Sequence, residues 1–87
     1  MIKKTIVVKN TQGLHARPAK QFVNMAKKYA SKINVAYGEK TINAKSILEL
    51  MALGVGCGKT ITITAEGEDE AKAVEGLIHL VESDMES

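Results

Sequence analysis

The residues best suited to chemistry lie in the segment Gly13-Leu14-His15-Ala16-Arg17-Pro18-Ala19-Lys20. Proline is accepted in the first turn of a helix but not in its interior, so a helix is expected to begin near Ala16 or Arg17, directly after the histidine. The first turn of a helix leaves backbone N–H groups without intrahelical acceptors, and those of Ala16 and Arg17 would form an anion site. The Arg17 guanidinium adds donors whose geometry matches phosphate oxygens.

An imidazole at such a place is suited to carrying a phosphoryl group. The positive helix end and Arg17 both disfavour the imidazolium ion, so we expect them to lower the pKa of His15 and keep the ring neutral and nucleophilic. Once the phosphoryl group is bound, the dipole contributes about 0.3–1 kcal/mol and each hydrogen bond to the charged group about 1.5–3 kcal/mol. Of the two ring nitrogens, Nδ1 lies closer to the backbone and therefore to the helix amides. No acid, second base or metal cluster lies nearby in the sequence to activate water. The pattern indicates that His15 relays a phosphoryl group. The alternative is a loop histidine that only caps the helix.

Hydrophobic periodicity predicts the elements that position this segment. Apolar residues recur at helical spacing from Ala19 to Ala26, and the last helix, after the acidic run 68–70, has the apolar stripe Ala71, Val74, Leu77, Ile78 and Val81. A two-residue hairpin is expected at Gly38-Glu39, with glycine at its first central position. Ser46 and Glu49 have the spacing of a capping box, which opens a short helix that ends at Leu53 before Gly54. Strands are expected over residues 2–8, 33–37, 40–43 and 60–65.

The element order is therefore β-α-β-β-α-β-α, which predicts an α+β fold. Four strands and three amphipathic helices imply a two-layer open-faced sandwich, in which a four-stranded antiparallel sheet has all three helices on one face. The 87 residues, 45% of them apolar and 25% charged, suit one folded domain over residues 1–87.

Charge is divided sharply along the chain. Residues 1–45 carry ten lysines and arginines against one acid, a formal charge of +9, whereas residues 46–87 carry nine acids and two lysines, a charge of −7. The basic half is suited to an anionic partner, and the alternative is that the two halves pair with each other. The single Cys57 excludes an internal disulfide and a cysteine-built zinc site, and we expect no metal and no cofactor. No apolar run approaches a membrane span, so a cytoplasmic protein without membrane insertion is expected.

Several motifs carry a resemblance to a known family. The segment 13–19 resembles the phosphohistidine signature of HPr, the phosphocarrier of the bacterial phosphoenolpyruvate-dependent sugar phosphotransferase system. Asn43-Ala44-Lys45-Ser46-Ile47 is similar to the regulatory serine motif of the Gram-positive type, and the likeness continues through 51–54 and 66–70.

The resemblance implies a carrier protein rather than an enzyme. His15 would accept a phosphoryl group on Nδ1 from enzyme I and pass it to IIA domains of sugar permeases, while Arg17 would steady the transferring group. Ser46, apart from its role as an N-cap, would be phosphorylated by HPr kinase/phosphorylase, and a catabolite-control transcription factor would be a further partner. Many kinase-regulated relatives have glycine in place of Glu49 and methionine in place of Leu48. Glu49 would oppose a phosphate on Ser46.

The short helix is apolar on nearly every side, more than one core contact requires. We expect Leu50 and Leu53 in the core, and we define a docking patch that comprises Ile47, Leu48 and Met51 together with Lys20 and Lys27. Arg17 and Lys45 are expected at its border. Such a patch would complement acidic, apolar partner surfaces, and the alternative is that all five apolar residues of the helix are core.

Other functions remain open at this point. A small basic nucleic-acid-binding module would fit the charge and the element order, but the few aromatics, Phe22, Tyr29 and Tyr37, do not suggest a stacking surface. An HPr-like regulatory protein that binds transcription factors without carrying phosphate is a second alternative. The stretch 54–60 resembles a phosphate-binding loop, but its first glycine is one residue out of place and it follows a helix and precedes a strand, so that function is rejected. Residues 54–58 are interpreted as a flexible loop. His79 is expected to be a solvated surface residue, and a monomer is expected.

Overall fold

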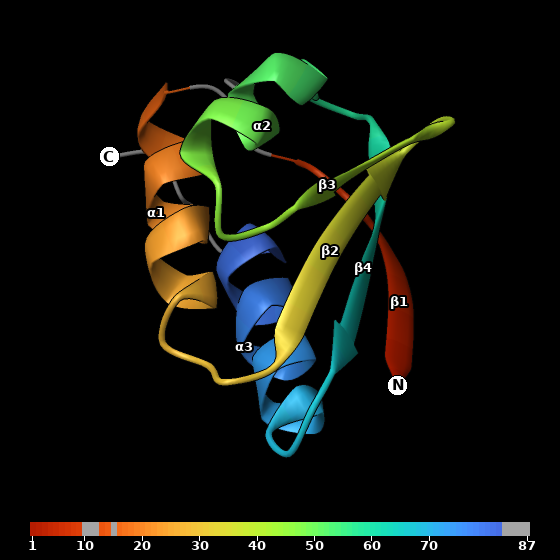
Figure 1. Cartoon of the computed structure of the whole chain (residues 1–87). Helices are drawn as coiled ribbons and strands as arrows, with labels where there is room; N and C mark the ends of the chain where they lie inside the picture. The colour runs from red at the N-terminus through yellow and green to blue at the C-terminus, as the bar shows by residue number, and fades with distance from the viewer. Residues whose placement is uncertain (10–12, 15, 83–87) are drawn as a thin grey trace.

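The structure, a computed structural model, describes residues 1–9, 13–14 and 16–82. The elements appear in the predicted order. They are β1 (Ile2–Val7), α1 (Ala16–Ala26), β2 (Lys32–Tyr37), β3 (Lys40–Asn43), α2 (Ile47–Leu53), β4 (Thr60–Glu66) and α3 (Glu70–Glu82), as Figure 1 shows.

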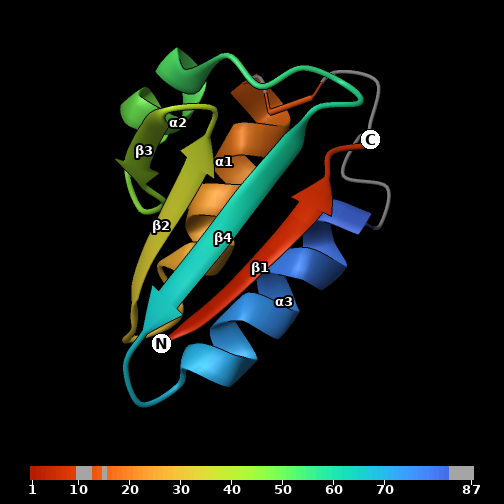
Figure 2. The ribbon, with the colours of Figure 1, turned by 90° about the vertical axis from the view of Figure 1, so that its right-hand side faces the viewer.

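The strands form one four-stranded sheet in the order β1-β4-β2-β3, with β1 antiparallel to β4 and β2 antiparallel to both β4 and β3. The helices lie on one face of the sheet, and no helix of the described residues covers the other face (Figure 2). The predicted α+β open-faced sandwich is confirmed. Its register places Ile6 beside Ile61 and Val35 beside Ile63, so the alternating apolar residues of the central strands share the helical face.

The hairpin between β2 and β3 has the predicted two-residue loop. Tyr37 pairs with Lys40, which leaves Gly38 and Glu39 as the central residues. Gly38 has a φ of 63°, whereas no described residue other than glycine has a positive φ. A left-handed residue at the first central position alone is the geometry of a type II′ turn, and glycine adopts it without a steric penalty.

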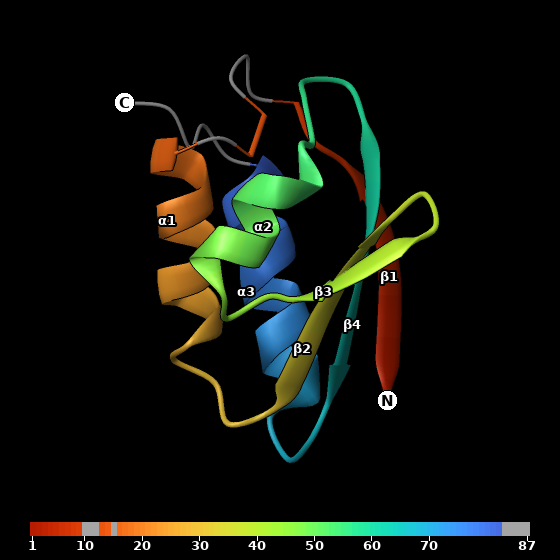
Figure 3. The same ribbon diagram turned by 45° about the horizontal axis from the view of Figure 1, so that its top comes forward.

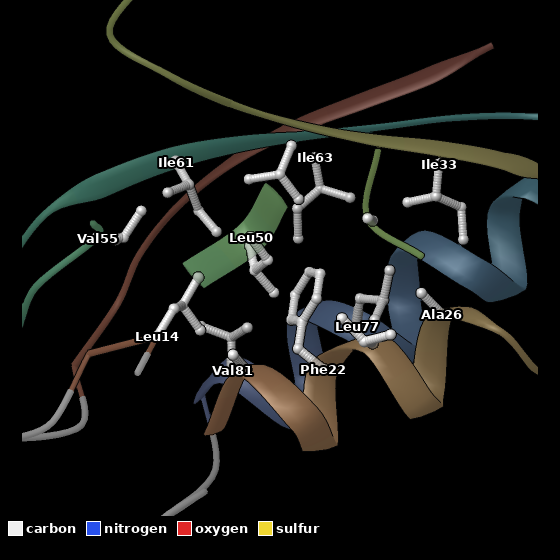
Figure 4. Close-up of a cluster of buried hydrophobic side chains, with 14 of the residues drawn as sticks. Leu14, Phe22, Ala26, Ile33, Leu50, Val55, Ile61, Ile63, Leu77 and Val81 are labelled. Atoms are coloured by element: carbon white, nitrogen blue, oxygen red, sulfur yellow. The ribbon is translucent and has the colours of Figure 1, made fainter. Parts of the chain in front are cut away.

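The core lies between the sheet and the helices (Figure 4). Phe22 of α1, Leu50 of α2 and Leu77 of α3 are all fully buried there, opposite Ile61 and Ile63 of β4. These side chains come from every layer, so the burial of apolar surface joins the helices to the sheet.

The structure corrects two details of the sequence interpretation. In α3, Ala73 rather than Ala71 belongs to the buried stripe, because Ala71 is exposed and Ile78 is only half-buried. The helix therefore turns its buried face slightly away from the predicted one. The first strand ends at Val7, one residue early, because Val7 pairs with Thr60, the first residue of β4. The backbone of Val8 is bonded to the loop that precedes β4.

A polar contact joins the α1–β2 connection to the β4–α3 turn. The Asp69 carboxylate accepts hydrogen bonds from the backbone N–H groups of Ala30, at 2.8 Å, and Ser31, at 2.9 Å, and also from the Ser31 hydroxyl. The Ser31 hydroxyl and the Ala30 N–H together lower the pKa of Asp69.

Within the described ranges, no helix is long and apolar enough to cross a membrane.

Candidate functional site

Helix α1 begins where the sequence predicted. Its first residue is Ala16, directly after His15, and Pro18 lies buried in the first turn. Ala16 and Arg17 are exposed. His15 itself lies outside the described residues, so the role of its imidazole as phosphoryl acceptor stays a prediction. What the structure contributes is the position of the helix start, whose first-turn N–H groups lack intrahelical acceptors.

The backbone just before His15 is held by a segment that the sequence analysis did not connect with it. The Leu14 N–H donates to the Val55 carbonyl at 2.9 Å, and both side chains are fully buried. Residues 54–59, here called the α2–β4 loop, run from the end of α2 into β4. The sequence predicts a flexible loop over residues 54–58, the greater part of this segment. Glycines in a loop indicate that another backbone segment can approach closely, but they do not identify which segment that is.

Ser46 caps α2 as predicted, but the capping box is only half formed. Its Oγ accepts from the Glu49 N–H at 3.4 Å, and Gly54, with a φ of 71°, ends the helix. The Glu49 carboxylate does not return to Ser46: it accepts from the Asn43 N–H at 3.2 Å. The Ser46 N–H donates instead to the Asn43 carbonyl. The Asn43 N–H therefore takes the place of the Ser46 N–H as the donor to the Glu49 carboxylate.

The side chains of α2 divide as expected. Leu50 is completely buried and Leu53 nearly so, whereas Leu48 is 79% exposed and Ile47 and Met51 are each more than one third exposed. The alternative in which all five are core is wrong.

The basic residues around this helix divide as well. Lys20 is exposed on α1 and Lys27 is exposed directly after the end of that helix, and α1 packs against α2 (Figure 3). Lys45 differs, because it is half-buried and its ammonium donates to the Tyr29 carbonyl at 2.8 Å. The use of the docking patch by a partner stays a prediction.

The remaining candidates lie on the surface. His79 is exposed on α3, as predicted. Cys57 is an exposed free thiol in the α2–β4 loop, 3.6 Å from the Lys9 carbonyl. In the described part of the chain, no three histidine, cysteine or acidic residues are grouped so that they could hold a metal ion.

Comparison with known proteins decides the family. A family model described as the "PTS HPr component phosphorylation site" matches residues 2–83. The chain belongs to the HPr family. HPr is a phosphocarrier protein of the phosphotransferase system and not a catalyst, so membership supports the function of a phosphocarrier in that system.

Individual relatives agree with this result. The phosphocarrier protein HPr of Buchnera aphidicola is 47% identical over 88% of this chain and 91% of its own length. The HPr-like protein Crh of Halalkalibacterium halodurans is 45% identical over 97% of this chain and its whole length. A crystal structure of HPr from Thermoanaerobacter tengcongensis superposes with a TM-score of 0.94 at 48% identity, covering 95% of this chain and 93% of that one.

At least one related structure is described as a dimer. A crystal structure of an HPr dimer from Thermoanaerobacter tengcongensis matches the whole of this chain with a TM-score of 0.80 at 46% identity. The expectation that this chain is a monomer therefore stays a prediction within the HPr family.

Proposed function

We propose that His15 accepts a phosphoryl group on Nδ1 from the phosphohistidine of enzyme I and donates it to IIA domains of sugar permeases, in the cytoplasm. The observation that carries this proposal is the start of α1 at Ala16, the residue next to His15, in a chain matched by a phosphorylation-site family model. A helix N-terminus favours an anion, because its N–H groups and its dipole both point toward the negative charge. Exposed Arg17 in the same turn supplies guanidinium donors for phosphate oxygens.

The chemistry needs no further group. When His15 is loaded, the N–P bond to the imidazole of enzyme I breaks as an N–P bond to Nδ1 of His15 forms, so the bond that breaks and the bond that forms are of the same kind. The residues around His15 have to position the group and stabilise its charge, as is usual in phosphoryl transfer. A phosphoryl group stabilised by a few kcal/mol is held without being trapped, which suits a carrier.

The test is intact mass spectrometry after incubation with enzyme I and phosphoenolpyruvate. The wild-type chain is expected to gain one acid-labile phosphoryl group, and His15→Ala is expected to gain none. His79→Ala is the matched control, because it removes the other histidine from an exposed position on α3 and is expected to label fully. Label that persists in His15→Ala would overturn the assignment.

The docking patch supports the encounter with these partners. We propose that exposed Leu48, with Ile47 and Met51, contacts apolar partner surfaces. Lys20 and Lys27 would attract the acidic residues around such surfaces. Electrostatic attraction of this kind favours fast and short-lived complexes, which a relay protein requires.

We propose Ser46 as the regulatory phosphorylation site for HPr kinase/phosphorylase. Its hydroxyl belongs to a half-exposed N-cap, and a phosphate at a helix N-terminus is compatible with the fold. Glu49 is one turn away and would repel the phosphate, so Glu49→Gln is expected to be phosphorylated faster than the wild-type chain. Incubation with the kinase and ATP tests this, with Ser46→Ala as the control. An unchanged mass of the wild-type chain would contradict the proposal.

A second candidate function is that of an HPr-like regulatory protein that binds a catabolite-control transcription factor. The similarity to the HPr-like protein Crh favours it. The enzyme I assay separates the two functions, because a purely regulatory protein would take no phosphoryl group on His15.

The nucleic-acid-binding alternative has less support. Phe22 is fully buried, and Tyr29 and Tyr37 are partly buried against the core, so the chain's three aromatic rings are not displayed as a stacking surface. A salt-dependent mobility shift with RNA would restore that alternative.

A further inference from the structure

The α2–β4 loop contacts the chain on both sides of residues 10–12. On one side, the Gly58 N–H donates to the Val8 carbonyl at 2.7 Å, and the Val8 N–H donates to the Lys59 carbonyl at 2.8 Å. On the other side, the Leu14 N–H donates to the Val55 carbonyl at 2.9 Å. In both Figure 2 and Figure 3 this loop lies at the same end of the molecule as the end of β1 and the start of α1. One loop thus fastens both flanks of the segment that leads to His15.

The contact at Gly13 is too close for any side chain. Gly13 has a φ of +62°, and a Cβ added there would lie 2.7 Å from Gly56 Cα and against the Val55 carbonyl oxygen. These are backbone atoms, which cannot swing aside as the end of a long side chain can. The loop also cannot retreat easily, because Val55 is packed in the core close to Leu14 (Figure 4).

The tertiary structure therefore holds the backbone of both chain neighbours of residue 15. Leu14 is bonded to the Val55 carbonyl, and Ala16 is the first residue of α1. We propose that Val55, through its main-chain carbonyl, and Gly13, through the absence of a side chain, are positioning residues for phosphoryl transfer at His15. This inference rests on the proposed function. It adds that the loop after α2 holds the backbone of Leu14, the residue directly before His15, for this transfer.

The magnitude follows from the sensitivity of transfer reactions to alignment. A displacement of about 1 Å away from the productive geometry can lower a rate by about 100-fold. A Cβ at Gly13 would need to move the backbone by a comparable distance to relieve its contacts with Gly56. We therefore expect Gly13→Ala to slow the transfer about 10- to 100-fold.

Gly38→Ala is the matched control. Gly38 has a φ of +63°, almost identical to that of Gly13, but a Cβ there would meet nothing within 4 Å. Both variants place an alanine at a positive φ, and only Gly13→Ala also meets the loop. Urea unfolding measures the stability cost of each variant, and single-turnover phosphorylation by phosphorylated enzyme I measures the rate and the KM separately. Gly13→Ala is expected to lose rate at saturating enzyme I with little change in KM, because the docking patch is untouched. Gly38→Ala is expected to keep the wild-type rate.

A second variant keeps the test decisive if Gly13→Ala does not fold. Gly58 has a φ of +83° with open space around its Cβ position, so Gly58→Ala strains the α2–β4 loop without touching Gly13. It is expected to slow the transfer in the same direction by a smaller factor. Wild-type rates in every folded variant of Gly13 and Gly58 would overturn the positioning role while the carrier function stands. A wild-type chain that accepts no phosphoryl group would overturn the proposed function, and this inference with it.

Discussion

A glycine within α3 offers a test of how helix propensity and packing compete in this fold. Replacement of a helical glycine by alanine normally stabilises a protein by about 1 kcal/mol. At Gly76, however, an added Cβ would lie against the Tyr29 hydroxyl and 3.2 Å from Tyr29 Cζ. Tyr29 follows α1 and is partly buried, with its hydroxyl 3.9 Å from Met25 Sδ. The added Cβ would therefore displace the Tyr29 ring and disturb its contact with Met25.

The two effects can be compared in size. Overpacking of a close contact typically costs about 1–3 kcal/mol, which outweighs the gain in propensity. We expect Gly76→Ala to lower the free energy of unfolding by up to about 2 kcal/mol, and each kcal/mol corresponds to roughly 4–8 °C in Tm for a domain of this size. In the Tyr29→Phe background the hydroxyl is gone, so Gly76→Ala is expected to be neutral or stabilising by up to about 1 kcal/mol.

The assay is urea unfolding of the wild-type chain, both single variants and the double variant. The cycle is expected to give a coupling energy of about 1–3 kcal/mol between residues 29 and 76. Lys72→Ala, at an exposed position of the same helix, serves as the control and is expected to change stability by less than about 0.5 kcal/mol. If Gly76→Ala stabilises the chain by the full propensity gain and the coupling energy is near zero, the reasoning about Tyr29 is refuted.

Two further predictions concern the core and the pH dependence of stability. Leu50→Ala is expected to cost about 2–5 kcal/mol because Leu50 is fully buried, and thermal unfolding should separate it clearly from Leu48→Ala, whose side chain is 79% exposed. The hydrogen bonds from Ser31 and Ala30 lower the pKa of Asp69 from its usual value of 3.8, so its ionised form stabilises the fold above that value and the contribution is lost as the pH falls through the lower folded-state pKa. Asp69→Asn is therefore expected to be less stable than the wild-type chain at neutral pH, with a difference that shrinks in urea titrations below pH 3.8. A difference that is the same at all pH values would contradict this cause.

Local patterns were sufficient for most of the elements. Pro18 located the start of α1, because proline is accepted in a first turn and nowhere further inside a helix. Gly38 located the hairpin, because its left-handed φ suits the first position of the turn. Ser46 and Gly54 located both ends of α2. Each of these signals depends on the backbone preferences of one or two residues, so it can be recognised without knowledge of the fold.

The partner that a side chain selects among several neighbouring groups was harder to predict. The capping-box spacing is present at Ser46 and Glu49, but the carboxylate bonds to the Asn43 N–H, which comes from the end of β3. The stripe of α3 was misplaced at Ala71 because helical spacing defines a face only to within a residue or so, and the position of the sheet selects the buried side.

By itself, the sequence determined the order of the elements, the α+β class, the placement of a histidine and an arginine at a helix start, and a resemblance that the family comparison confirmed. Only the tertiary structure decided that the α2–β4 loop fastens the backbone before His15 and that Asp69 joins two distant turns. The physical reason is the separation along the chain between the residues that interact. Helix starts, caps and turns are local preferences, whereas the contact between Gly13 and Gly56 depends on the packing of segments that are far apart in the chain.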